Sequence, residues 1–126
     1  MVTGATMLLR PGEAGAIRGE MEAARAWRRA TQPLAEPNCG SVFTNPPGDH
    51  AARLVESVGA KGLRVGGAGV STKHSNFIVV DAGASASDVL SLIEQVRGLV
   101  LERTGIHLEM EVRLVGAFEG DRPAAR

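Results

Sequence analysis

The stretch FIVVDAGASASDVLSLIEQVRGLVLERTGIHLEMEVRLV, residues 77–115, holds the clearest structural signals in the chain. It opens on a short apolar run at residues 77–80, which predicts a strand. Ser85 and, three positions later, Asp88 form a pair like a capping box, which predicts that a helix begins there. Residues 106–115 then alternate apolar and polar side chains, which predicts a strand with one buried face. The stretch therefore predicts a helix between two strands.

Outside this stretch the same signals predict two more helices. Residues 13–30 repeat apolar side chains at three- and four-residue spacing, which gives the expected helix one apolar face. Asp49 is expected to cap a second helix that ends at Gly59, and Gly105 is expected to end the helix that begins at Ser85. Strands separated by helices predict an α+β fold, in which a small mixed or antiparallel sheet packs with about three helices.

The remaining segments are expected to be short strands and loops. Residues 5–9 and 41–43 are short apolar runs that end at turn residues, and each predicts a strand. Residues 60–76 are glycine-rich and polar, which predicts a loop, or a loop with a short strand inside it.

The composition excludes several classes of function. The 126 residues suit one domain, with 44% apolar and 22% charged residues. Fourteen Lys and Arg balance fourteen Asp and Glu, and aromatic residues are scarce, so we expect no nucleic-acid partner. The chain has no apolar run near the roughly 20 residues of a membrane span, and its single cysteine suits a reducing compartment. We therefore expect a cytoplasmic protein with no membrane contact.

Common catalytic and phosphate-binding motifs are incomplete in this sequence. The run GLRVGGAGVS, residues 62–71, matches neither a Walker loop nor a dinucleotide fingerprint. Its glycines either bring backbone N–H groups close to an anion or form a tight loop that needs positive φ angles. Ser41 lacks the second glycine of a hydrolase G-x-S-x-G elbow. The potential metal ligands lie in separate segments, so we predict no metal site; they are His50, His74, His107 and Cys39.

Several polar residues remain that these motifs do not explain. Ser41 lies in a short expected strand, Lys73 and His74 lie in the glycine-rich loop, and Glu111 lies on the polar face of the last expected strand. Each is either an ordinary structural or surface residue or part of a site, and the residues alone leave both interpretations open. Arginines also cluster at the end of the first helix, where they either meet the negative end of the helix dipole or face a phosphate: Arg25, Arg28 and Arg29.

Three motifs, taken together, resemble a known family. They are GSVF-x-NPPG at residues 40–48, KGLRVGGA-x-VS-x-KH-x-NF at residues 61–77 and EVRLVG at residues 111–116. In this order they resemble the C-terminal part of the UDP-N-acetylenolpyruvoylglucosamine reductases, flavoenzymes also called UDP-N-acetylmuramate dehydrogenases. The resemblance covers about residues 2–116, and the compact spacing is similar to the family's shorter type.

The resemblance implies a domain organisation and a reaction. Members of this family have two FAD-binding domains followed by a substrate-binding domain, and they reduce UDP-N-acetylglucosamine enolpyruvate to UDP-N-acetylmuramate with NADPH through FAD. The implied parts of this chain are the closing strand of a FAD-binding domain at residues 1–12, the substrate-binding domain at residues 13–118 and a flexible tail at residues 119–126. The flavin-binding residues are expected on domains upstream of this chain.

The resemblance also implies roles for individual residues. Ser41 matches the family's general acid, and Glu111 matches the glutamate that stabilises the enolic intermediate. Asn45 matches a position that contacts the substrate. Three further residues lie in segments that line the substrate side: Gln32, Lys73 and His74.

The implied missing domains have consequences for activity and for the surface. We expect this chain to be inactive as a reductase by itself, and the alternatives are a non-catalytic UDP-sugar-binding module and an inert truncated fragment. Apolar residues are expected to be exposed toward the missing domains: Leu8, Leu9, Val42 and Phe43.

Overall fold

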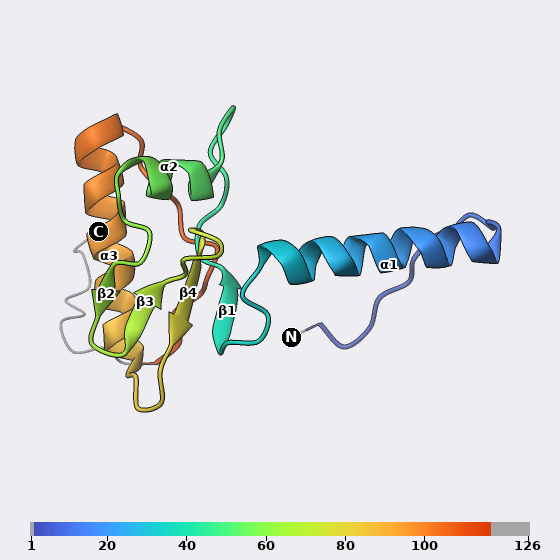
Figure 1. The fold of residues 1–126 in the computed structure, drawn as a ribbon, viewed down its shortest axis with the longest axis horizontal. Helices are drawn as coiled ribbons and strands as arrows, with labels where there is room; N and C mark the ends of the chain where they lie inside the picture. Colours follow the sequence, from blue (N-terminus) through green and yellow to red (C-terminus); the bar gives the residue numbers. More distant parts are fainter. Residues whose placement is uncertain (1, 117–126) are drawn as a thin grey trace. The chain divides into compact units, whose positions relative to one another are not determined.

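Figure 1 shows the computed structural model, which describes residues 2–116. The chain divides into two compact units, residues 1–30 and residues 31–126. The helices and strands, in chain order, are α1 (Ala14–Thr31), β1 (Asn38–Ser41), α2 (Ala51–Ser57), β2 (Arg64–Val65), β3 (Ala68–Val70), β4 (Phe77–Val80) and α3 (Ala86–Thr104). The α+β fold expected from the sequence is confirmed, and within residues 2–116 no helix is long and apolar enough to cross a membrane.

The first unit consists of an irregular segment followed by nearly all of α1. The carboxylate of Glu13 accepts hydrogen bonds from the backbone N–H groups of Gly15 and Ala16, at 2.8 and 2.7 Å. These bonds lower the pKa of Glu13 and satisfy two of the N–H groups that a helix start leaves without partners. The helix expected over residues 13–30 is confirmed, displaced by one residue.

Of two further expectations for this unit, one is wrong and one is confirmed. The strand expected over residues 5–9 is wrong, because residues 2–13 contain no helix or strand. A strand exists only through backbone hydrogen bonds to a neighbour, and an apolar run alone does not supply one. The predicted exposure of Leu8 and Leu9 is confirmed, and α1 itself buries no side chain, so its apolar residues Ile17 and Trp27 also lie exposed.

The second unit is built on a four-stranded antiparallel sheet with the order β1-β4-β3-β2. The glycine-rich region forms the β2–β3 hairpin, so it contains two short strands where the sequence predicted at most one. The strand expected over residues 77–80 is confirmed as β4, which lies between β1 and β3. The strand expected over residues 41–43 lies earlier, and β1 ends at Ser41.

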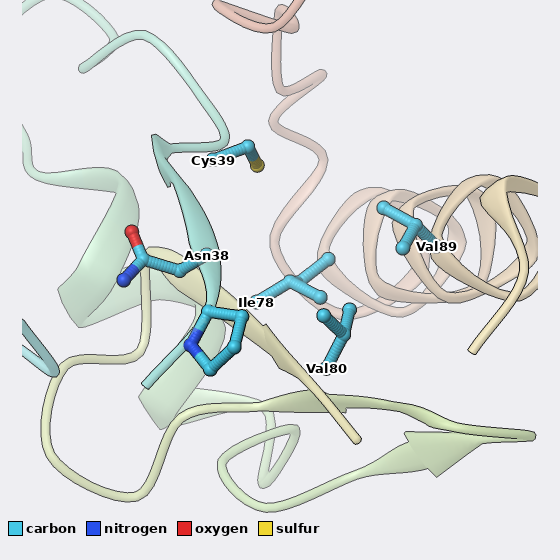
Figure 2. A pocket seen from close by; sticks show the side chains of 6 residues that line it. Asn38, Cys39, Ile78, Val80 and Val89 are labelled. Carbon is cyan, nitrogen blue, oxygen red and sulfur yellow. The ribbon is translucent and has the colours of Figure 1, made fainter. Parts of the chain in front are cut away.

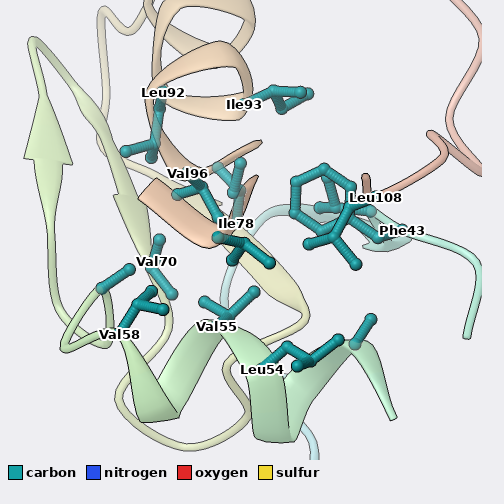
Figure 3. Close-up of a cluster of buried hydrophobic side chains, with 14 of the residues drawn as sticks. Phe43, Leu54, Val55, Val58, Val70, Ile78, Leu92, Ile93, Val96 and Leu108 are labelled. Atoms are coloured by element: carbon teal, nitrogen blue, oxygen red, sulfur yellow. The ribbon is translucent and has the colours of Figure 1, made fainter. Parts of the chain in front are cut away.

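The core of this unit lies between the sheet, α2 and α3 (Figure 3). Helix α3 contributes four buried residues and contacts β2 and β3, while α2 contributes three and also contacts α3. Val42 and Phe43 belong to this core at 1% and 3% exposure, so the expectation that they are exposed is wrong. Both directly follow β1 in the chain, and they belong to the same buried cluster as Leu108 and Ile78.

The start and the end of α3 follow the sequence signals. Ser85 Oγ accepts a hydrogen bond from Asp88 N, and the Asp88 carboxylate accepts one from Ser85 N, which is the complete capping box. Gly105 ends the helix with a left-handed φ of 71°. The Asp88 carboxylate also accepts a hydrogen bond from Gly67 N at 3.3 Å, so the cap fastens the β2–β3 hairpin to the helix. These N–H donors lower the pKa of Asp88.

Two expected elements differ in the structure. His50 occupies the N-cap position of α2, and the Asp49 carboxylate instead accepts hydrogen bonds from His50 N and from Arg53. The strand expected over residues 106–115 is wrong, because within the described residues the β pairing of this segment is limited to the isolated bridge between Phe43 and Met110. The segment that carries Phe43 could pair with it over only a few residues, because Pro46 and Pro47 follow and lack N–H groups. The pairing of β1, which precedes this segment, is also irregular between Asn38 and Ser41.

We predict that Ser85→Ala lowers the free energy of unfolding by about 1 kcal/mol, because one helix N–H group loses its acceptor. Urea denaturation followed by circular dichroism measures the change. Ser87→Ala is the matched control, because Ser87 is exposed in the first turn of α3 and lies outside the capping box. Equal stability of the Ser85 variant and the parent protein would contradict the assignment of the cap.

Candidate functional site

The candidate site forms where three segments meet around Val42 and Phe43. The segments are residues 41–44, residues 75–77 and residues 109–112, and we refer to them together as the junction. Val42 N donates to Asn76 O at 2.9 Å, and Val42 O accepts from Glu111 N at 2.8 Å. The backbone of Val42 therefore bonds to both neighbouring segments, and it holds the middle segment between them.

Asn76 completes the junction with its side chain. Its Oδ1 accepts a hydrogen bond from Phe43 N at 2.9 Å, and its Nδ2 donates to Phe43 O at 2.8 Å. A second backbone peptide would make the same pair of bonds in an antiparallel ladder. The amide of Asn76 therefore continues the β1–β4 pairing beyond the end of β1 and the beginning of β4. The two polar groups of the amide and the N–H and C=O groups of Phe43 are all buried.

The junction brings together the segments that carry Ser41 and Glu111. Ser41 is half-buried at the end of β1, opposite Phe77 and directly before Val42. Glu111 is exposed, and its backbone N–H is the group that bonds to Val42 O. Ser41 and Glu111, which are 70 positions apart in the sequence, thus lie on adjacent segments. Ser41 directly precedes Val42 in the chain, and the backbone of Glu111 is hydrogen-bonded to that of Val42.

The turn between β3 and β4 holds Lys73 and His74. Ser71 Oγ accepts hydrogen bonds from the backbone N–H groups of Lys73 and His74, at 3.1 and 3.4 Å, which fixes the course of the turn. His74 is half-buried, its Nδ1 accepts a hydrogen bond from Asn76 N at 3.3 Å, and its ring meets Phe77 edge-on at 4.9 Å. Ser75 Oγ is buried and, within residues 2–116, has no hydrogen-bond partner. His74 thus supports the residue that completes the junction.

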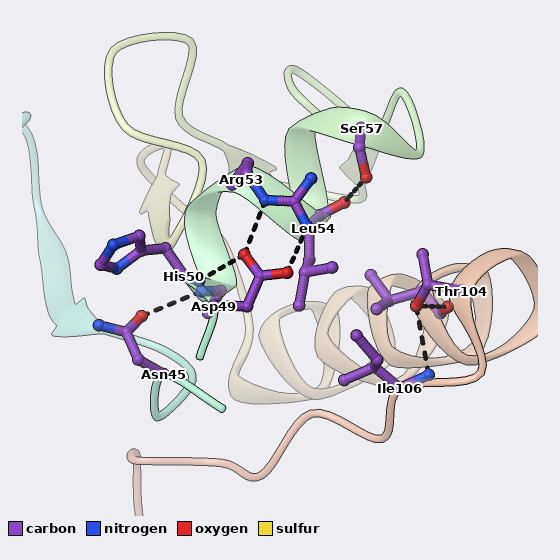
Figure 4. A network of polar contacts seen from close by, with 10 residues as sticks. Asn45, Asp49, His50, Arg53, Leu54, Ser57, Thr104 and Ile106 are labelled. Atoms are coloured by element: carbon purple, nitrogen blue, oxygen red, sulfur yellow. Dashed lines mark hydrogen bonds and ion pairs between the residues drawn. The ribbon is translucent and has the colours of Figure 1, made fainter. Parts of the chain in front are cut away.

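Asn45 lies beyond the junction and supports the start of α2 (Figure 4). Its Oδ1 accepts a hydrogen bond from Ala51 N at 3.0 Å, which replaces the side-chain cap that His50 does not provide. The acceptor oxygen of Asn45 is therefore occupied, while its amide NH₂ group lies on an exposed side chain. A ligand at this position would meet hydrogen-bond donors.

Gln32 belongs to the second unit, whereas the arginines of α1 belong to the first. Gln32 is half-buried at the start of the connector to β1, and its backbone carbonyl accepts a hydrogen bond from Leu34 N at 2.9 Å. The arginine cluster belongs to the first unit, and all three side chains are exposed on α1: Arg25, Arg28 and Arg29.

Two apolar hollows border β1 and α3 (Figure 2 shows the first). The first has a volume of about 260 Å³ and is lined by apolar side chains around Cys39, including Ile78, Val80 and Val89. The second, of about 330 Å³, shares Cys39 and Val89. Desolvation raises the pKa of the Cys39 thiol, which disfavours the thiolate that a nucleophile needs. Neither hollow is lined by Ser41 or Glu111, so neither of them is the candidate site.

The glycine-rich segment decides between the two interpretations left open by the sequence. Gly66 has a φ of 52°, and a side-chain carbon added there would lie 2.5 Å from the carboxylate of Asp88. One added at Gly67 would lie 2.7 Å from Ala84. The anion that accepts a hydrogen bond from Gly67 N is the protein's own Asp88, whose carboxylate also lies beside Gly66, and this supports the interpretation as a tight loop. The glycines at residues 66 and 67 therefore do not fit a flavin or nucleotide phosphate site, and the described residues contain no cluster of three His, Cys, Asp or Glu side chains that would hold a metal ion.

Comparison with known proteins adds the family. A sequence model of the UDP-N-acetylenolpyruvoylglucosamine reductase C-terminal domain matches residues 32–115, which is most of the chain and contains the whole junction. The chain belongs to this family. The match begins two residues after the division between the two structural units.

Individual members of the reductase family are similar over nearly the whole chain. The UDP-N-acetylenolpyruvoylglucosamine reductase of Alkalilimnicola ehrlichii is 53% identical over 112 residues, which cover 89% of this chain and 38% of that protein. The reductase of Anaeromyxobacter dehalogenans strain 2CP-C is 55% identical over 116 residues, which cover 92% of this chain and 35% of that protein. The chain thus spans a little over a third of the length of the curated relatives it matches.

A solved structure is similar as well. The UDP-N-acetylenolpyruvylglucosamine reductase of Thermus caldophilus is 39% identical and superposes with a TM-score of 0.62. The superposition covers 79% of this chain and 34% of the Thermus protein. The architecture of the reductase C-terminal part is therefore present in this chain.

Sequence reasoning identified two of the residues at the junction and missed a third. Ser41 and Glu111 were identified from the family motifs, and the structure brings their segments together. Asn76 was not identified, although it lies in the same motif as Lys73 and His74. The available signal was a polar residue directly before an apolar strand, and that pattern gives no hint of a partner 33 positions away.

We predict that the ion pair between Asp49 and Arg53 makes stability depend on pH in the acid range. Hydrogen bonds from the Arg53 side chain and from His50 N lower the pKa of Asp49 to about 2, from 3.8. Because the folded-state pKa is lower than the unfolded one, this contribution is fully present above about pH 4 and is lost as the pH falls toward 2. Asp49→Asn removes it, so urea denaturation should show a difference from the parent protein at pH 5 that shrinks by pH 2. A difference that is constant with pH would contradict the prediction.

Proposed function

We propose that this chain is the substrate-binding and proton-donating part of an enzyme that reduces UDP-N-acetylglucosamine enolpyruvate to UDP-N-acetylmuramate. That reaction supplies a peptidoglycan precursor in the cytoplasm. One observation carries the proposal: Val42 joins the segments of Ser41 and Glu111, the two residues to which the family resemblance gives chemical roles. The family match over residues 32–115 supports the same assignment.

Ser41 is proposed as the general acid. Reduction adds hydrogen to both carbons of the enolpyruvyl double bond, and the carbon beside the carboxylate becomes enolate-like before it receives a proton. A serine hydroxyl is a weak acid, so it must be held within hydrogen-bond reach of that carbon and be polarised by its surroundings. The half-buried end of β1, where the chain leaves the sheet, holds the hydroxyl on a fixed backbone.

Glu111 is proposed to stabilise the enolic intermediate. Its backbone is fixed by the hydrogen bond to Val42 O, while its side chain stays exposed on the surface of this chain. A protonated carboxyl there would donate a hydrogen bond to the enolic oxygens, and such a preformed donor stabilises charge that develops during the reaction.

The remaining residues are proposed to bind the UDP-sugar. Asn45 offers an amide NH₂ group, Lys73 offers a cation beside the β3–β4 turn, and both are exposed. His74 borders the same turn, and Gln32 lies before β1. Donors and cations suit a substrate that carries a diphosphate and a carboxylate.

FAD and NADPH are proposed as the cofactors of the complete enzyme, on the strength of the family alone. Residues 2–116 do not fit a flavin phosphate site at the glycine-rich loop, because Asp88 and Ala84 already occupy the space beside its glycines. We therefore assign no flavin contact to residues 2–116, and the FAD-binding domains of the family are the proposed partners. The domain boundary at residues 12 and 13 likewise stays a prediction.

A chimera tests the role of Ser41. This chain replaces the matching 112 residues of the Alkalilimnicola ehrlichii reductase, and UDP-N-acetylmuramate is measured by chromatography. We predict that Ser41→Ala lowers product formation by about 10²- to 10⁴-fold, because proton delivery is lost, while NADPH still reduces the flavin. The control is Ser57→Ala, since Ser57 lies in α2, outside the junction, and its hydroxyl donates to Leu54 O of the same helix. An inactive parent chimera, or full turnover without the Ser41 hydroxyl, would refute the proposal.

Glu111 has a separate prediction in the same chimera. Glu111→Met keeps the approximate length of the side chain but removes its hydrogen-bond donor, and we expect turnover to fall by about 10²-fold. Glu102→Met is the control, because Glu102 is an exposed carboxylate on α3 with the same change in charge. If both variants turn over at the parent rate, Glu111 has no role in the chemistry.

A second candidate function is a UDP-sugar-binding module without catalysis, for which the exposed Asn45 and Lys73 side chains would serve equally well. Calorimetric titration of the 126-residue chain with UDP-N-acetylglucosamine enolpyruvate separates the alternatives. Binding together with an inactive chimera indicates a binding module. Absence of both binding and chimera activity indicates an inert fragment.

A further inference from the structure

Asn76 joins two of the three segments of the junction, residues 75–77 and residues 41–44, and the backbone of the latter joins them to the third. Its backbone carbonyl bonds to Val42 N, and its side-chain amide bonds to both polar groups of Phe43. Three hydrogen bonds from one residue therefore fix the two positions that follow Ser41. The next bonds along the chain run to the other side, from Thr44 N to Glu109 O and from Glu111 N to Val42 O.

The backbone N–H and C=O groups of Phe43 depend on the Asn76 amide for their hydrogen bonds. Phe43 is buried at 3% exposure, so its N–H and C=O groups have no access to solvent if the amide is removed. Buried backbone groups without partners are strongly unfavourable, and the segment would have to move to satisfy them. Because Val42 O holds Glu111 N, a shift of this segment moves the backbone of Glu111 as well as that of Ser41.

We propose that Asn76 is a positioning residue for the reaction, which holds Ser41 and Glu111 in a fixed arrangement through the backbone of Val42 and Phe43. The inference rests on the proposed function for the roles of those two residues. Asn76 itself acts through the backbone and is not assigned any contact with the substrate.

The chemistry of the side chain explains why an asparagine occupies this position. The amide presents one acceptor and one donor side by side, which matches the N–H and C=O groups of a single residue. An ionised aspartate would accept from Phe43 N but would repel Phe43 O. A protonated aspartic acid restores the donor, so Asn76→Asp is a variant whose function should depend on its own protonation.

The groups around Asn76 define the controls that this variant needs. His74 accepts a hydrogen bond from Asn76 N, and Lys73 precedes it in the same turn. On the segment across Val42, the charged side chains are Glu109 and Glu111, both exposed. The parent protein carries all four groups, so a pH dependence that appears only in the variant belongs to the new carboxyl. Burial beside a carbonyl oxygen is expected to raise its pKa above the ordinary value for aspartate.

The first experiment measures hydrogen exchange in the 126-residue chain. Amide protection factors are used because they remove the intrinsic pH dependence of exchange. In Asn76→Asp at pH 7.5, we expect the protection of the Phe43 and Val42 amides to fall at least tenfold, and to recover toward the parent value at pH 5. Unchanged protection at pH 7.5 would overturn the proposal.

The second experiment measures turnover in the chimera, with Ser85→Ala as a control that destabilises the domain far from the junction. We expect Asn76→Asp to lower kcat by about 10²-fold at pH 7.5, since a displacement of about 1 Å costs that much, and to regain activity relative to the parent as the pH falls. Asn76→Leu, which has no donor or acceptor, should lose kcat at every pH. Ser85→Ala should keep the parent's kcat and pH profile at a temperature where it is folded.

The outcomes separate this inference from the proposed function. If Ser41→Ala abolishes turnover while Asn76→Asp retains the parent's kcat and pH profile, the positioning role is wrong and the proposed function stands. If the variant loses kcat without any recovery at low pH, the effect is general destabilisation and the inference fails. If Ser41→Ala has no effect, the proposed function fails first.

Discussion

The second unit depends on the hydrogen bonds that the backbone of Val42 and Phe43 makes to both sides. The middle segment of the junction bonds to Asn76 on one side and to Glu109 and Glu111 on the other. Its side chains are buried in the common core at the same time. Any displacement of this segment would break buried hydrogen bonds and open the core together, so the segment has one favourable position.

These hydrogen bonds fix the backbone of residues 41–44 as well as the ladder of a regular sheet would. The strands here are only two to four residues long, and ladders of that length are weak by themselves. The Asn76 amide and the bridge at Met110 extend the ordered region past the end of β1. A chemical group placed on this region, such as the Ser41 hydroxyl, inherits a fixed backbone, while its surroundings stay open at the surface of this chain.

Expectations based on local sequence agree best with the structure where the stabilising interactions join residues that are close together in the sequence. The capping box at Ser85, the left-handed Gly105 and the run of residues 77–80 each involve groups a few positions apart, so the sequence contains both partners of the interaction. Asp49 shows the limit of that logic. Its carboxylate has two competing local partners, and the charged Arg53 one turn later, together with His50 N, provides stronger bonds than the capping position would.

The sequence by itself determined the helices, the strand at residues 77–80, the α+β class and, through its motifs, the family and the candidate residues Ser41 and Glu111. Only the tertiary structure decided that residues 5–9 and 106–115 are not strands, that Val42 and Phe43 are buried, and that Asn76 joins the site. The physical reason is the same in each case. A partner distant in sequence is required for strand pairing, for burial and for the hydrogen bonds of a buried backbone group. An apolar pattern indicates that such a partner is needed but not which residues provide it.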